Sequence, residues 1–93
     1  MKLKESIAIV TGGASGLGEA CVRSLASEGA KVCIFDLAEE RGSKIAAELG
    51  SNVMFARADV TSEESVQVAV KQTINTFGGL NVAINCADVA DPR

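Results

Sequence analysis

The feature that most constrains the fold is an alternation of short apolar runs with longer segments of helical periodicity. Continuous apolar runs bounded by turn residues are typical of strands buried on both faces. The predicted strands cover residues 7–11, 31–36, 52–59 and 81–85, and the predicted helices cover 17–28, 39–50 and 62–77. Strands that alternate with helices imply right-handed crossovers and a parallel sheet. The sequence therefore predicts a doubly wound α/β fold with strand order 3-2-1-4.

The predicted helices carry recognisable inner faces and end signals. We expect apolar stripes on the first and third helices, at Leu17, Cys21, Leu25 and Ala26 and at Val66, Val70, Ile74 and Phe77. Glycine follows each helix, at Gly29, Gly50 and Gly78, where a C-terminal cap commonly lies. Thr61 and Glu64 have the spacing of a capping box, which predicts that the third helix begins after Thr61.

Composition restricts the class of protein further. The 93 residues suffice for one domain, and the 47% apolar content with a net charge of −3 argues against disorder. A pI near 4.8 argues against a nucleic-acid partner. We expect no membrane span and no export signal, so the cytoplasm is the expected compartment. The three cysteines, Cys21, Cys33 and Cys86, fit no zinc pattern and are interpreted as small buried apolar residues.

The segment TGGASGLG lies between the first predicted strand and the first predicted helix. Its glycines follow a T-G-x-x-x-G-x-G pattern at Thr11, Gly12, Gly16 and Gly18, which differs from the G-x-G-x-x-G fingerprint. A helix N-terminus attracts a phosphate when no side chain blocks the approach. A tight glycine turn without a ligand is the alternative, but the strand–loop–helix context favours a pyrophosphate site.

Asp36 ends the second predicted strand, eighteen residues after Gly18. A carboxylate in that place accepts hydrogen bonds from both ribose hydroxyls of an adenosine and repels a 2′-phosphate. Leu37 follows it, and the glycine loop carries no Arg or Lys, so we expect NAD rather than NADP. A solvated carboxylate at a strand end is the alternative interpretation.

Two further strand ends carry polar groups. Asp59, with the backbone N–H of Val60, is a candidate partner for an adenine ring. A helix-capping turn before Thr61 is the alternative, and the two interpretations are compatible. Asn85 ends the fourth predicted strand, where we expect it to tie neighbouring strand ends together.

The motifs TGGASGLG, FDL, ADVTSE and NCA together resemble the short-chain dehydrogenase/reductase family over essentially the whole chain. The glycine loop and DVTSE most resemble the branch that contains 3-hydroxyacyl-CoA dehydrogenase type 2, also called 17-beta-hydroxysteroid dehydrogenase type 10. The resemblance implies a Rossmann-like fold, with residues 1–93 as the N-terminal, NAD-binding half of a larger domain. It also implies a parent enzyme that transfers hydride between NAD and a secondary alcohol or ketone, and that is a homo-oligomer.

The resemblance assigns roles along the carboxyl ends of the strands. Gly12, Gly16 and Gly18 would hold the pyrophosphate, Asp36 the ribose, and Asp59 with Val60 the adenine, while Asn85, Cys86 and Ala87 would line the path to the nicotinamide. Ser15, Leu17 and Leu37 complete the expected cofactor-binding set.

Two departures from the family pattern affect the expected activity. Asp88 stands where the family has a glycine, and a carboxylate there would repel the pyrophosphate. The chain has no tyrosine, so the family's Ser–Tyr–Lys set is absent from these 93 residues, which we expect to be inactive alone. The alternatives are an inactive NAD-binding module and an S-adenosylmethionine-binding domain. The latter usually lacks this glycine spacing.

The predicted topology leaves one sheet face with a single helix and the fourth strand at an open edge. Uncovered apolar faces and free edges promote association. We therefore expect the chain either to self-associate near Val82 and Ile84 or to pair with a missing C-terminal part.

Overall fold

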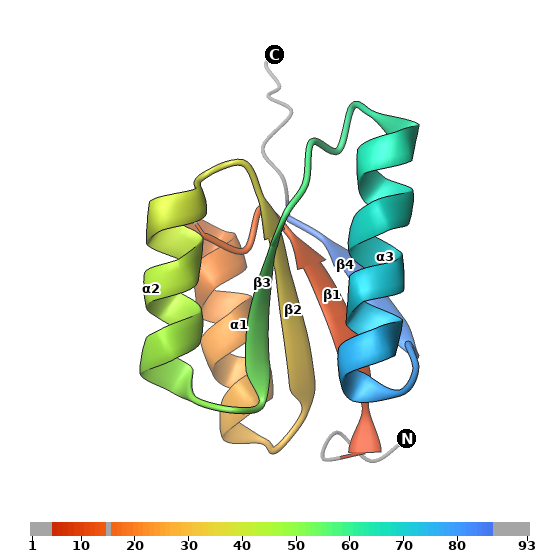
Figure 1. Cartoon of the computed structure of the whole chain (residues 1–93). Helices are drawn as coiled ribbons and strands as arrows, with labels where there is room; N and C mark the ends of the chain where they lie inside the picture. The colour runs from red at the N-terminus through yellow and green to blue at the C-terminus, as the bar shows by residue number, and fades with distance from the viewer. Residues whose placement is uncertain (1–4, 15, 87–93) are drawn as a thin grey trace.

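The computed structural model describes residues 5–14 and 16–86. Within these ranges strands and helices alternate as the sequence predicts (Figure 1). They are β1 (Ile7–Thr11), α1 (Gly16–Ser27), β2 (Lys31–Asp36), α2 (Glu39–Leu49), β3 (Val53–Arg57), α3 (Glu63–Phe77) and β4 (Val82–Asn85). The bounds of β2 match the prediction at both ends, whereas β3 ends at Arg57, two residues before Asp59.

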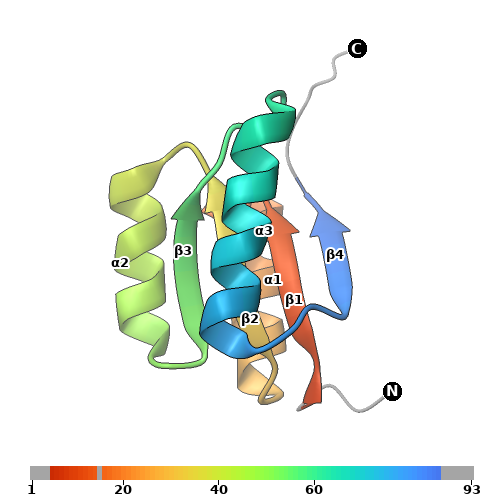
Figure 2. The same cartoon turned by 45° about the vertical axis from the view of Figure 1, so that its right-hand side comes forward.

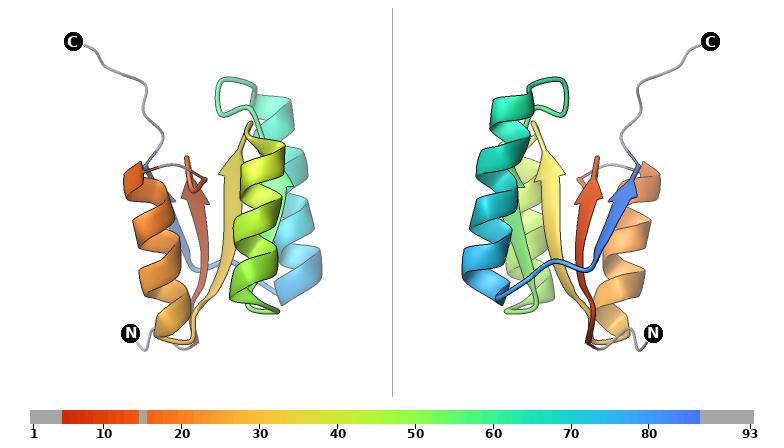
Figure 3. Two further views of the ribbon diagram at one scale, coloured as in Figure 1. Left: turned by 90° about the vertical axis from the view of Figure 1, so that its left-hand side faces the viewer. Right: turned by 90° about the vertical axis from the view of Figure 1, so that its right-hand side faces the viewer.

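The described strands form one parallel sheet with the order β3-β2-β1-β4, which confirms the predicted topology. Helices α1 and α2 cover one face, and α3 lies on the other (Figure 3). All four strands point the same way, so the loops that follow them meet at one edge of the sheet. That edge holds the residues of the predicted site that the structure describes.

The two faces bury separate apolar clusters. On the side of α1 and α2 the buried residues are Val10, Ala14, Val22, Val32, Ile34, Ile45 and Val53. On the side of α3 they are Ile9, Cys33, Phe35, Ala56, Ala58 and Ala69. Adjacent residues of β1 and β2 enter opposite clusters, as expected for strands covered on both faces. Among the residues that the structure describes, no helix combines the length and apolar character that a bilayer crossing requires.

Two predicted inner-face residues are in fact exposed. Leu17 is 73% exposed because it lies in the first turn of α1, at the edge of the sheet rather than over it. Ile74 is 43% exposed, because α3 turns Ala69 and Thr73 toward the sheet. The other predicted residues of the α3 stripe, Val66, Val70 and Phe77, are partly buried against the apolar cluster on that side of the sheet.

The predicted capping box of α3 is wrong by one residue. Ser62 is the N-cap, and its hydroxyl accepts a hydrogen bond from the Ser65 N–H at 3.2 Å. The Thr61 hydroxyl instead donates to the Asp59 carboxylate at 2.6 Å. Because Thr61 is held in that turn, the helix begins one residue later than the sequence predicts. The three glycine caps are confirmed, with φ angles of 90° at Gly29, 94° at Gly50 and 90° at Gly78.

Strand β4 lies at the edge of the sheet, beside β1 (Figure 2). Within the described residues its outer edge has no strand partner. Ile84 packs on the side of α1, and Val82, two residues earlier in the strand, shares that face. Contrary to our expectation, neither side chain therefore lies on the face that has a single helix. The residues that β4 presents on the side of α3 are Ala83 and Asn85, and both are exposed. Association through this edge stays a prediction, and the apolar surface available for it is smaller than expected.

Helix α2 packs against β3 through Gly42. A Cβ atom at this position would lie 2.3 Å from two ring carbons of Phe55. The absence of a side chain at Gly42 therefore sets the distance between this helix and the sheet.

We expect Gly42→Ala to destabilise the chain by about 1–2 kcal/mol, because overpacking of the Phe55 ring outweighs the better helix propensity of alanine. Thermal unfolding measures this. Ser43→Ala, at the exposed neighbouring position of the same helix, is the control and should be neutral or slightly stabilising. Equal midpoints for the two variants would contradict the packing argument.

Candidate functional site

Backbone hydrogen bonds join the carboxyl ends of all four strands. Gly12 N–H donates to Phe35 O at 2.8 Å, and Ala58 N–H donates to Asp36 O at 3.1 Å. On the other side, Cys86 N–H donates to Thr11 O at 3.0 Å. The loops that carry the predicted site residues are therefore fixed to one another immediately beyond the sheet.

The glycine loop uses its glycines for two different reasons. At Gly18 a Cβ atom would lie 1.9 Å from Gly12 O, so the first turns of α1 pack directly on the loop backbone. At Gly16 a Cβ atom would meet nothing within 4 Å, but φ is +42°, a conformation that glycine adopts at little cost. Gly18 therefore allows close packing, whereas Gly16 leaves space open in front of the helix N-terminus.

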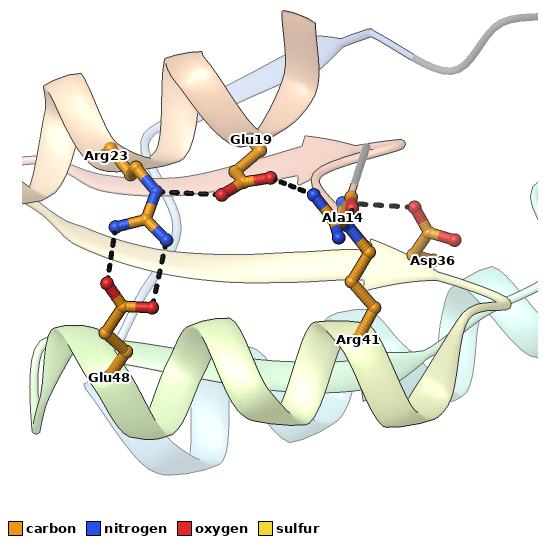
Figure 4. Close-up of polar contacts among 6 residues, drawn as sticks. All are labelled: Ala14, Glu19, Arg23, Asp36, Arg41 and Glu48. Carbon is orange, nitrogen blue, oxygen red and sulfur yellow. Dashed lines mark hydrogen bonds and ion pairs between the residues drawn. The ribbon is translucent and has the colours of Figure 1, made fainter. Parts of the chain in front are cut away.

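Asp36 ties the glycine loop to the end of β2 (Figure 4). Its Oδ2 accepts a hydrogen bond from Ala14 N–H at 3.1 Å, and its Oδ1 accepts one from Ala38 N–H at 2.9 Å. Each carboxylate oxygen has a second lone pair, so both remain able to accept a ligand hydroxyl. The carboxylate is half-buried and lies beside the loop, as expected from the sequence.

A charged network that the sequence analysis missed also reaches the loop (Figure 4). Arg41, in the first turn of α2, donates to Ala14 O and, at 2.5 Å, to Glu19. Arg23 donates to the other oxygen of Glu19 at 2.9 Å and makes two bonds of 3.0 Å to Glu48. Hydrogen bonds from Arg23 and Arg41 lower the pKa of Glu19. In the sequence, α2 begins soon after Asp36. This short connection is the signal that would have indicated that Arg41 lies near the loop.

Asp59 adopts the turn that we considered as the alternative to adenine binding. Its Oδ1 accepts hydrogen bonds from the Thr61 hydroxyl and from Thr61 N–H at 2.6 and 2.9 Å. These bonds lower the pKa of Asp59. Asp59 N–H donates to the Ser65 hydroxyl at 2.9 Å, which joins the turn to α3. The turn leaves the neighbouring Val60 40% exposed.

Asn85 ends β4, and its side chain bonds to the end of β1 as predicted. The Thr11 hydroxyl donates to Asn85 Oδ1 at 2.7 Å. Cys86 follows, and its sulfur lies 3.7 Å from the sulfur of Cys21 on α1. Asn85 therefore connects β4 to the end of β1, and Cys86 connects it to α1.

Exposed apolar side chains accompany the polar groups at this edge. Leu17, in the first turn of α1, is 73% exposed, and Leu37, which directly follows β2, is 53% exposed. Of the remaining predicted positions, Ser15, Ala87 and Asp88 lie outside the described residues.

The short chain dehydrogenase family model matches residues 6–93. The chain belongs to that family. The chain spans about a third of the length of the relatives that it matches, whereas we expected it to be half of the domain. It is 44% identical to the 3-hydroxyacyl-CoA dehydrogenase type-2 of Drosophila melanogaster over 95% of this chain and 34% of that protein.

Solved structures of other short chain dehydrogenases agree with this assignment. A 3-hydroxyacyl-CoA dehydrogenase type-2 from Mycobacterium avium matches with a TM-score of 0.84 and 45% identity, over 91% of this chain and 33% of that one. A 3-ketoacyl-(acyl-carrier-protein) reductase from Brucella melitensis, complexed with NADH, matches with a TM-score of 0.85 and 32% identity, over 87% of this chain and 33% of that one. Both matches cover most of this chain, so the doubly wound Rossmann-like fold is shown.

The contact between Arg41 and the loop gives a prediction for this family member. We expect Arg41→Met to weaken dinucleotide binding about three- to tenfold, because Ala14 O loses a charged donor that holds the loop. Arg23→Met is the matched control, since Arg23 also pairs with Glu19 but directs its other hydrogen bonds to Glu48 on α2 rather than to the loop. Fluorescence titration with NADH compares the two. An equal loss in both variants would assign the effect to Glu19 instead.

Proposed function

We propose that the chain is the NAD(H)-binding part of an oxidoreductase that acts on a secondary alcohol or ketone. The observation that carries this proposal is the glycine loop, where Gly18 packs on backbone and Gly16 leaves open space, next to a carboxylate bonded to the same loop. This arrangement fits a dinucleotide, because the helix N-terminus favours an anion and the carboxylate favours ribose hydroxyls.

Each group of residues has a defined part in holding the cofactor. Gly12, Gly16 and Gly18 would leave the backbone open to the pyrophosphate, and Asp36 would accept the adenosine ribose hydroxyls. When bound, the nicotinamide supplies the hydride acceptor or donor. The exposed side chains of Leu17, Leu37 and Val60 would cover apolar faces of the cofactor.

Asp36 and Arg41 act in opposite directions on the choice of cofactor. The carboxylate disfavours a 2′-phosphate, whereas a guanidinium attracts one. Arg41 already donates to Glu19 and Ala14, so its charge is largely compensated. We therefore propose NAD rather than NADP, even though a basic group lies closer to the loop than the sequence analysis assumed.

The names of the relatives support a substrate class. The chain is 46% identical over 88 residues to the human 3-hydroxyacyl-CoA dehydrogenase type-2 and 43% identical over 91 residues to a 3-beta-hydroxysteroid dehydrogenase of Comamonas testosteroni. Both names specify a hydroxyl on a carbon chain or ring. A 3-hydroxyacyl thioester or a hydroxysteroid is the substrate class that we propose for the whole protein.

An NAD-binding module without activity is the second candidate, and one observation favours it. The 93 residues contain no tyrosine and no histidine, so the usual proton-transfer groups of such a reaction are missing from them.

Titration of the chain with NADH and NADPH tests the binding proposal. Incubation of the whole protein with NAD and a 3-hydroxyacyl thioester separates the two candidates, because both predict no turnover by these 93 residues alone. We expect saturable binding of NADH, tighter than that of NADPH, without turnover by these residues alone. A folded chain that binds neither nucleotide would refute both candidates, whereas steady NADH production would exclude the inactive module.

A further inference from the structure

Two of the three cysteines are in contact although they lie far apart in the sequence. The sulfurs of Cys21 and Cys86 are 3.7 Å apart, with a sequence separation of 65 residues. Both residues are partly buried and pack beside the cluster on the side of α1 and α2. Cys33 is fully buried in the cluster on the opposite face of the sheet. The sequence predicts the same role for all three cysteines, but the structure separates one pair from the third.

The backbones of the pair are held by independent contacts. Cys86 N–H bonds to Thr11 O, which fixes the end of β4 against β1. Cys21 lies one turn beyond Gly18, where α1 packs directly on the glycine loop. The separation of the sulfurs is therefore set by the fold, and a bond of about 2.0 Å requires a small approach of the two side chains.

We propose that Cys21 and Cys86 form a reversible disulfide that joins the end of β4 to α1, with a peroxide as the oxidant. One thiolate attacks a peroxide oxygen, which breaks the O–O bond, releases hydroxide and leaves a sulfenic acid. The second thiolate attacks that sulfur, forms the S–S bond and expels hydroxide. The two thiols lose two electrons in total, and hydrogen peroxide is reduced to two molecules of water. A dithiol reverses the step by exchange.

The surroundings favour a disulfide over the other uses of a cysteine pair. Within the described residues no group of three potential metal ligands exists, so the two sulfurs lack the further ligands that a zinc site needs. The partial exposure of both cysteines admits a small oxidant. Cys33 provides an internal contrast, because it is fully buried and therefore inaccessible to the oxidant. Burial raises the pKa of the thiols of both Cys33 and Cys86, so access to the oxidant distinguishes the two residues.

The disulfide would act on the least supported strand of the sheet. β4 pairs only with β1 among the described strands, and α1 lies on the far side of these two strands from α3 (Figure 3). A bond from Cys86 to α1 would close a long loop and hold this edge strand in place. Long closed loops gain the most from a cross-link in the chain-entropy model.

The test is peptide mapping of the full 93-residue chain after oxidation. The reduced chain is treated with one equivalent of hydrogen peroxide, alkylated and digested with trypsin, which cleaves between each pair of cysteines. We expect a Cys21–Cys86 cross-link, an alkylated Cys33, and loss of the cross-link after treatment with dithiothreitol. Cys33→Ala should keep the cross-link, whereas Cys21→Ala should remove it.

Oxidation in urea supplies the reference for an unfolded chain. Loop-closure entropy then favours the short Cys21–Cys33 loop. The same pattern of cross-links with and without urea would overturn the proposal, as would sulfinic acid at Cys86 without a cross-link. The oxidised chain should also unfold about 10 °C higher than the reduced chain. A cross-linked chain with an unchanged midpoint would refute the role of the bond in holding β4.

Discussion

Replacement of Gly18 by alanine is expected to abolish the folded state of the glycine loop and, with it, dinucleotide binding. The added Cβ would lie 1.9 Å from the oxygen and 2.6 Å from the carbon of Gly12, and 2.9 Å from the Cα of Gly13. These are backbone atoms, so no side-chain rotation relieves the overlap. Helix α1 would have to move off the loop, at a cost of about 3 kcal/mol or more. Chemical denaturation and NADH titration measure the two losses.

Gly16→Ala is the matched control for Gly18→Ala. Its methyl group meets no atom within 4 Å, so the main cost to folding is the φ of +42°, about 1–2 kcal/mol for alanine. We expect this variant to fold but to bind NADH poorly, because the methyl group enters the space that we assign to the pyrophosphate. If Gly16→Ala unfolded the chain and Gly18→Ala did not, the roles that we give to the two glycines would be wrong.

Removal of the charge of Asp36 is expected to erase the preference for NADH over NADPH. Hydrogen bonds to a charged group contribute about 1.5–3 kcal/mol, so Asp36→Asn should weaken NADH binding about tenfold or more while relieving the repulsion of a 2′-phosphate. Asparagine retains one acceptor oxygen for the bond from Ala14 N–H or Ala38 N–H. Fluorescence titration of both nucleotides gives the ratio of affinities.

Asp36→Ala separates the two functions of this side chain. Alanine removes the charge and also both bonds to the backbone, so we expect a further loss of affinity for both nucleotides and a lower thermal midpoint. Equal affinities of the unsubstituted chain for NADH and NADPH would contradict the assignment. So would an unaltered ratio in Asp36→Asn.

The sheet could be predicted because each strand is encoded locally. Residues 32–35 form a continuous apolar run between Lys31 and the carboxylate of Asp36, and β2 begins and ends at these two charged residues. Right-handed crossovers hold for nearly all parallel connections, so the order 3-2-1-4 places α1 and α2 on one face of the sheet and α3 on the other. The glycine loop and Asp36 were found together because parallel topology brings consecutive strand ends to one edge.

Details that depend on contacts between elements could not be predicted in this way. The start of α3 moved because the Thr61 hydroxyl bonds to Asp59, a local competition that the spacing of Thr61 and Glu64 does not reveal. Arg41 was overlooked because its contact with Ala14 crosses from α2 to the loop. The cysteine pair was overlooked for the same reason, since 65 residues separate its members.

The position of β1 in the sheet has a consequence for synthesis on the ribosome. Of the described strands β1 is made first, yet its two neighbours are β2 and β4, and residue Thr11 pairs with both Phe35 and Asn85. One side of β1 gains its partner early, whereas the other waits for roughly 50 further residues, which at ~5–20 residues per second takes about 2–10 s. During that interval the centre of the final sheet is an unprotected edge in the nascent chain. We therefore expect the segment Ile7–Thr11 to be the part of the nascent chain that a chaperone or the ribosome surface contacts at that stage.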